Sequence, residues 1–192
     1  VTMIKGWETF HPDVFPDIEP GKPIPLVNRH LMRSAQYFCD VTRAWRITLD
    51  AITLASGFTE YDIELEPGTE LVRIEEATID GQPLAVWRAG REPYEGSRYV
   101  HTPDGRSIQV SWTPSGAMTL VLTITARPGD SATGVDEALA ARYSKVIADG
   151  AKASLNKSQS EQQTFIDECN TIAARVWRGL SSARPRAKAM FL

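Results

Sequence analysis

The spacing of apolar residues divides the chain into three blocks. In the first, prolines at 12, 16, 20, 23 and 25 restrict φ and remove backbone donors, so residues 1–22 are predicted to form an extended or turning arm. From about residue 23 to 45 apolar residues recur at helical spacing on one face: Val27, Leu31, Ala35 and Phe38, with Met32 and Cys39 beside them. This pattern predicts an amphipathic helix.

The middle block, about residues 46–130, changes to a period of two, which is typical of strands. Alternation at 47–52 and 61–65, separated by Ser56-Gly57, predicts a hairpin. Asp80-Gly81 and Asp104-Gly105 are strong tight-turn dipeptides. The last strand, 118–126, ends before Pro128-Gly129. Short strands separated by regular turn signals indicate an antiparallel sandwich or a small barrel.

The third block, about residues 133–178, returns to helical spacing. One helix begins near Asp136 and Glu137 and contains Gly150, which either breaks it or permits close packing. A second apolar face runs from Phe165 to Trp177 and is expected to end at Gly179. Trp45, Trp112 and Trp177 are assigned to cores.

A single helix cannot bury its apolar stripe, so the first helix is expected to pack against the last two. The predicted fold is therefore α+β: a three-helix body formed by 23–45 and 133–178, with a β domain inserted at 46–130. An arm (1–22) and a C-terminal tail (179–192) flank this body.

Composition narrows the function classes. The chain has 192 residues, 42% hydrophobic and 23% charged, with a formal net charge of −3, which is typical of a soluble globular protein. This charge does not favour a surface that binds nucleic acid or anionic membrane throughout. No apolar run approaches the length of a membrane span, and the first residues lack a signal-peptide core. We therefore expect a protein made in the cytoplasm, with Cys39 and Cys169 as buried thiols.

Motifs for catalysis are absent from the sequence. It contains no Gly-x-Ser-x-Gly elbow and no phosphate-binding glycine loop, and its three histidines lack ligand partners at metal spacing. The carboxylate pairs Glu64/Glu66 and Glu75/Glu76 are interpreted as the wet faces of strands. We expect a non-enzymatic protein without a cofactor, metal or catalytic residue.

One cluster of possible metal ligands leaves two interpretations open. It comprises His11, Asp13, Asp17 and Glu19, where prolines would hold the backbone. Solvated acids on a proline-rich arm are the commoner case, and a metal site is the alternative.

Two segments have the composition of interfaces. Trp87 lies among Arg88, Arg91 and Arg98, and tryptophan and arginine are enriched in protein contacts. The C-terminal tail is basic and ends in apolar residues, which suits docking into a partner's groove. Its candidate docking residues are Arg184, Arg186, Lys188, Met190, Phe191 and Leu192.

The segment Pro23–Cys39, followed by Thr42-Arg43-Ala44-Trp45, resembles the first helix of the head-to-tail adaptor (connector) proteins of tailed bacteriophages. Residues 143–155, with Ile147-Ala148-Asp149-Gly150-Ala151, are similar to the family's "isoleucine-alanine-x-glycine-alanine" segment. The likeness covers essentially the whole chain through packing signatures. It departs at 156–160, where a tryptophan or proline expected between the last two helices is missing.

The resemblance implies a virion protein of the neck or tail, assembled in the host cytoplasm. Such adaptors form a ring, typically of twelve subunits, beneath the portal, and their C-terminal segment docks on the portal protein. The β insertion tends to face tail or nozzle proteins and tail fibres. Genomic DNA passes through the channel, and no membrane is involved.

The alternative is a β-rich carbohydrate- or protein-binding module of a virion or cytoplasmic complex. It would use Trp87, Tyr94, Tyr99 and Trp112 as an aromatic platform, although alternation turns Trp112 inward. A hydrolase with an Asp/Glu pair is a third, weaker alternative.

Overall fold

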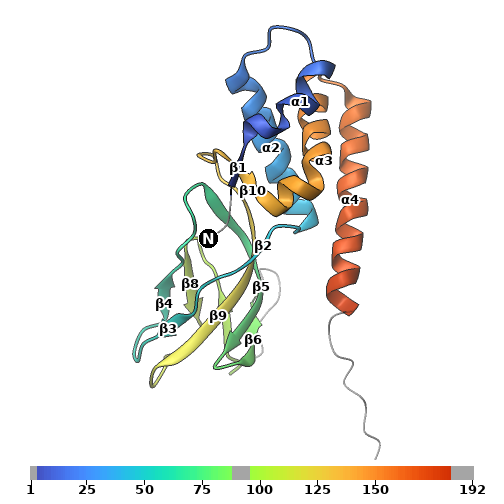
Figure 1. Ribbon diagram of the computed structural model, residues 1–192. Coiled ribbons are helices and arrows are strands. Elements are labelled where there is room, and N and C mark those ends of the chain that lie inside the picture. Colours follow the sequence, from blue (N-terminus) through green and yellow to red (C-terminus); the bar gives the residue numbers. More distant parts are fainter. Residues whose placement is uncertain (1–3, 88–95, 183–192) are drawn as a thin grey trace, which may run out of the picture. The chain divides into compact units, whose positions relative to one another are not determined.

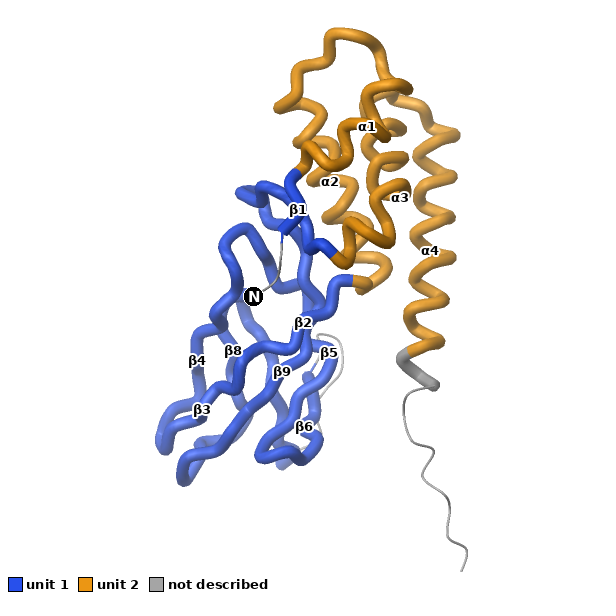
Figure 2. The backbone as a smooth tube through the Cα atoms, in the orientation of Figure 1, with its two compact units in different colours: residues 1–6, 45–137 blue, residues 7–44, 138–192 orange. Residues whose placement is uncertain are grey.

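The computed structural model describes residues 4–87 and 96–182 (Figure 1), and the chain folds into two compact units. One unit comprises residues 1–6 and 45–137, and the other residues 7–44 and 138–192 (Figure 2). The first is called the β unit and the second the helical unit.

The β unit is built on one curled sheet of eight strands. Their order is β2-β9-β5-β6-β7-β8-β4, and β3 also pairs with β9. The strands are β2 (Arg46–Thr48), β3 (Ile52–Leu54), β4 (Glu60–Asp62), β5 (Thr69–Ile79), β6 (Gln82–Val86), β7 (Tyr99–His101), β8 (Ser107–Val110) and β9 (Met118–Pro128). The β6–β7 pair is parallel and the other pairs are antiparallel, so the sheet is mixed.

The two long strands, β5 and β9, carry the curl. Their register shifts between Leu71 and Arg73 and again between Ile74 and Glu76, and such bulges bend a strand and increase its twist. At the end of β5, Asp80 (φ 48°) and Gly81 (φ 76°) form the tight turn into β6. Positive φ at both central residues is the turn that matches strand twist, as Asp-Gly predicts.

Large aliphatic side chains fill the inside of the curled sheet. Alternate positions of β9 are completely buried, and β8, β7, β5 and β3 contribute further members. The buried cluster contains Leu54, Ile74, Ala77, Val100, Ile108, Val110, Leu120, Leu122 and Ile124. A separate two-stranded sheet pairs β1 (Ile4–Gly6) with β10 (Gly134–Asp136). A Cβ at Gly134 would overlap the carbonyl of Lys5, so this pair needs glycine there.

The helical unit contains α2 (Ile24–Thr42), α3 (Glu137–Leu155, whose first residue belongs to the β unit) and α4 (Gln159–Ser182), preceded by η1 (Trp7–Phe10), α1 (His11–Val14) and η2 (Phe15–Asp17). Pro25 lies in the first turn of α2, where a missing N–H costs nothing. The helix ends at Arg43 in the left-handed conformation (φ 54°). Its predicted face, Val27, Leu31, Ala35, Phe38 and Cys39, is buried, which confirms the amphipathic pattern.

The three long helices meet at small residues. Gly150 of α3 lies so close to Ser34 Oγ of α2 and the Phe165 ring of α4 that a Cβ would overlap both. The Ser34 hydroxyl donates to the Ile147 carbonyl at 2.7 Å. The ring centroids of Phe38 and Tyr143 are 4.9 Å apart. Gly150 therefore permits close packing and does not break the helix, and the first long helix packs against the last two as expected.

The predicted architecture is wrong although the α+β class is right. A three-helix body with an antiparallel sandwich or small barrel was expected. The described residues instead form four α-helices, one large, curled, mixed sheet of eight strands and the separate two-stranded sheet. The parallel β6–β7 pair was missed because strand alternation does not encode which strands become neighbours.

Four local predictions are also corrected. The segment 7–17 is mostly helical, because Pro12 and Pro16 occupy the first positions of short helical turns. Strands β2 and β3 pair with β9 and β4 pairs with β8, so the predicted hairpin between 47–52 and 61–65 does not form. Helix α4 continues through Gly179 to Ser182. Trp177 is 46% exposed and lies against the Arg43 guanidinium, so it is not a core residue.

Candidate functional site

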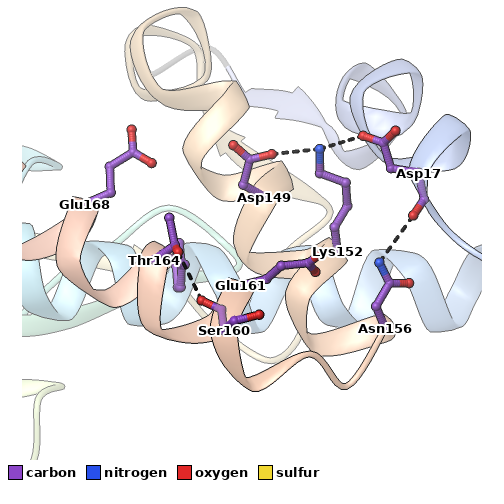
Figure 3. A pocket seen from close by; sticks show the side chains of 9 residues that line it. Asp17, Asp149, Lys152, Asn156, Ser160, Glu161, Thr164 and Glu168 are labelled. Carbon is purple, nitrogen blue, oxygen red and sulfur yellow. Dashed lines mark hydrogen bonds and ion pairs between the residues drawn. The ribbon is translucent and has the colours of Figure 1, made fainter.

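A groove of about 500 Å³ lies within the helical unit, where η2, α3 and the first turns of α4 meet (Figure 3). Its lining side chains are mostly polar, and acids outnumber bases. They are Asp17, Asp149, Lys152, Asn156, Ser160, Glu161, Thr164, Phe165 and Glu168. This set is called the acidic groove below.

One wall of the acidic groove is held together by Lys152. Its Nζ lies 2.9 Å from Asp17 Oδ2 and 2.7 Å from Asp149 Oδ1, and Asn156 Nδ2 donates to the Asp17 carbonyl at 3.2 Å (Figure 3). Burial lowers the pKa of Lys152, but hydrogen bonds and attraction from Asp149 and Asp17 outweigh it and raise the pKa overall. Lys152 is therefore a cation that is paired with both carboxylates.

The other wall comes from α4. Glu161 and Glu168 lie two turns apart, and within the described residues neither has an ion-pair partner. Phe165 lies between them on α4, is 9% exposed and packs with Tyr37 of α2 at 5.6 Å between ring centroids. The acidic groove thus offers two uncompensated carboxylates around an aromatic side chain, which suits a cationic side chain more than an anion.

The side chains that line the groove are mainly carboxylates, hydroxyls, one amide and one amine. Serine and threonine line it, but histidine and cysteine do not. Cys169, next along α4, is buried, and burial together with the Glu168 charge raises its pKa to about 12. At neutral pH it is a thiol, which is a poor nucleophile.

Trp87 belongs to an aromatic group in the β unit. Its ring centroid lies 6.5 Å from that of Tyr99 and 5.3 Å from that of His101. Val100 between them is buried in the sheet core, while Tyr99 and His101 are half-buried, so alternation puts them on the opposite face. Tyr99 and Trp87 of the predicted platform therefore meet.

The other platform and interface residues lie apart or outside the described chain. Trp112 packs against the sheet core, and the Arg98 guanidinium lies 5.4 Å from its ring centroid. Arg88, Arg91 and Tyr94 lie outside the described residues. The predicted docking tail also lies outside them, including Arg184, Arg186, Lys188, Met190, Phe191 and Leu192.

The possible metal ligands of residues 11–19 interact with different partners and not with one another. His11 Nε2 lies 2.7 Å from Asn28 Oδ1, Asp17 pairs with Lys152, and Glu19 pairs with Lys22. In the part of the chain that the structure describes, no group of three His, Cys, Asp or Glu side chains could hold a metal ion. None of the helices in that part is both long and apolar enough to cross a membrane.

Sequence reasoning missed the acidic groove. Its residues come from positions 17, 149–156 and 160–168. Asp17 is far from the others in the sequence, and only folding brings it close to them. A signal was present in Glu161, Phe165 and Glu168, whose i, i+4, i+7 spacing puts them on one helix face. The sequence matches no protein-family model and none of the curated proteins.

Proposed function

We propose that this chain is a structural head-to-tail adaptor of a tailed bacteriophage, one subunit of a ring between portal and tail, and that it has no catalytic activity. The observation that carries the proposal is the contact between the two segments that resemble the family. The segment 23–45 forms α2 and the segment 143–155 lies in α3, and they meet where Gly150 approaches Ser34.

The shared residues have a physical task at this contact. Leu31, Ala35 and Phe38 are buried on α2, and Ala148 and Ala151 are buried on α3 beside Gly150. The small residues among them, Ala35, Ala148, Ala151 and Gly150, allow the two helices to approach closely, and Leu31 and Phe38 fill the space beside them. A likeness in these positions is therefore a likeness in how the helices pack, and this supports a common helical unit.

The proposal assigns portal docking to the C-terminal residues Arg184 to Leu192. Three basic side chains precede Met190-Phe191-Leu192, which combines charge pairing at a rim with apolar burial in a groove. The ring subunits would be neighbours of the same chain, and the β unit would contact tail or nozzle proteins.

The test is binding to purified portal rings encoded by the same genome. Deletion of residues 184–192 is expected to abolish binding while the thermal unfolding curve stays unchanged. A matched pair of full-length variants separates the two forces: Arg184→Gln with Arg186→Gln and Lys188→Gln, or Met190→Ser with Phe191→Ser and Leu192→Ser. The first should lose salt-sensitive binding, and the second should weaken binding at every salt concentration.

Two results would contradict parts of this proposal. A truncated chain that binds portal like wild type removes the tail's role. Full-length protein that never binds portal removes the adaptor function itself.

A second candidate function rests on the group formed by Trp87, Tyr99 and His101. Half-exposed aromatic side chains on the face of a sheet opposite its core suit carbohydrate or a protein partner. Under this alternative, Trp87→Ala would abolish ligand binding and leave portal binding unchanged. A protein whose size does not change when portal is added would favour this alternative.

A further inference from the structure

The helical unit carries a basic face on α2 as well as the acidic groove. Arg29 and Arg33 are both exposed and lie one turn apart, so they share a face. In residues 4–87 and 96–182 neither has an ion-pair partner. Burial is the largest cause of the lowered pKa of His30, and the charges of Arg33 and Arg29 lower it further. Both charges therefore act on a neighbouring side chain.

An apolar side chain extends this basic face. Leu26 is 37% exposed and lies at i−3 from Arg29, on the same side of the helix. In the first half of α2 this face consists of Leu26, Arg29 and Arg33, an apolar residue followed by two cations, and the exposed Tyr37 and Asp40 follow in the second half. The acidic groove has the complementary charge, with the exposed carboxylates of Glu161 and Glu168 on α4.

We infer that the acidic groove binds the α2 face of a second copy of this chain, with Arg29 and Arg33 pairing with Glu161 and Glu168. The two surfaces belong to different helices of one unit, and within one copy the four charges stay without ion-pair partners in the described chain. A second copy satisfies both sets at once. Phosphate polymers are a poorer match for the α2 face, because two arginines are few for backbone binding and the chain's net charge is −3.

The geometry of such a contact has a consequence for assembly. Each copy would contribute its groove to one neighbour and its α2 face to another, which is a heterologous interface. Heterologous contacts close into rings when the rotation between copies permits. The inference thus deepens the proposed function, on which it rests, by naming the subunit contact of the ring.

The test is a charge swap followed by sedimentation velocity over a concentration series of the full-length protein. Variant A carries Arg29→Glu and Arg33→Glu, and variant B carries Glu161→Lys and Glu168→Lys. Wild type is expected to self-associate more weakly as salt is raised. Each variant alone should associate at least about tenfold more weakly, because its two faces then carry like charges. An equimolar mixture of A and B should restore association, because the face of A then matches the groove of B.

A matched control keeps the change in net charge and moves it elsewhere. Arg142→Glu with Lys145→Glu lies on an exposed part of α3 and changes the charge as variant A does. This control should self-associate like wild type. Thermal unfolding of every variant identifies any that fails to fold.

The inference is overturned if wild type stays monomeric at all concentrations, or if the mixture of A and B remains as weak as either variant alone. Portal binding is measured separately. Intact portal binding without self-association contradicts this contact alone, whereas self-association without portal binding contradicts the adaptor function alone.

Discussion

The helical unit and the β unit bury their cores in different ways. The helices meet at small residues, with Gly150 between Ser34 and Phe165, and no methyl group can be added there without displacement. The sheet instead curls around large aliphatic side chains, of which Leu54, Leu120, Leu122 and Ile124 are completely buried. The helical unit also buries large side chains, among them Phe10, Phe38 and Leu31, but its helix contact at Gly150 leaves no room for an added Cβ. The sheet core rests on the volume of its aliphatic side chains.

This difference predicts opposite sensitivities. A core held by side-chain volume loses stability when atoms are removed, because a cavity remains. A contact held by close approach loses stability when atoms are added, because rotamers or helices must shift. Matched substitutions in the two units therefore test this difference.

The largest effect is expected from truncation inside the sheet. Leu122 lies on β9, pairs with Ala77 of β5 and is completely buried. Leu122→Ala should lower the free energy of unfolding by about 2–5 kcal/mol. Urea unfolding followed by tryptophan fluorescence measures this. A loss below about 1 kcal/mol would mean that the sheet collapses around the cavity, and the comparison would then fail for this unit.

A smaller loss is expected from adding one methyl group in the helical unit. Gly150→Ala should gain helix propensity, yet lower the free energy of unfolding by about 1–3 kcal/mol because the methyl overlaps Ser34 and Phe165. The readout is helix melting by circular dichroism.

Gly179→Ala is the matched control for that change. Gly179 also lies inside a helix, α4, but no atom lies within 4 Å of an added Cβ. The control should stabilise the protein by about 0.5–1 kcal/mol or leave it unchanged. If both substitutions stabilise, close packing at Gly150 is not a constraint.

The two units also differ in how far the sequence predicted them. The amphipathic pattern of α2 and the Asp80-Gly81 turn were readable because each depends on residues close in the chain. The pairing of β2 and β3 with β9 joins residues about 70 positions apart, and no local pattern records it. The helical turns at 7–17 were missed because proline was interpreted as a breaker, whereas Pro12 and Pro16 lie at helix starts.

The candidate site was the least predictable part. Lys152 was not singled out because its partners, Asp17 and Asp149, stand on different elements, and charge on a helix is ordinarily solvated. Trp87 was identified from its arginine neighbours in the sequence, and its ring contacts with Tyr99 and His101 were not foreseen. Which side chains pair with each other can be recognised only when the fold of the backbone is known.

The smallest expected effect comes from a polar contact between two helices, in contrast to the aliphatic core of the sheet. His30 Nδ1 of α2 lies 2.8 Å from Ser154 Oγ of α3. Burial lowers the pKa of His30, and the positive charges of Arg33, Arg29 and Lys22 lower it further. A lowered pKa means that the unfolded chain takes up this proton first as the pH falls.

Stability should therefore be complete above pH 6.5, the ordinary value for histidine, and should decline as the pH falls toward the pKa of folded His30. His30→Gln should show a smaller decline than wild type over this window. A proton NMR titration should give His30 a pKa below 6.5, and Arg33→Gln should raise it, because a repelling charge is removed. A His30 pKa at or above 6.5 would show that burial and the neighbouring charges do not lower it. A pKa that stays the same in Arg33→Gln would show that the charge of Arg33 does not affect this ring.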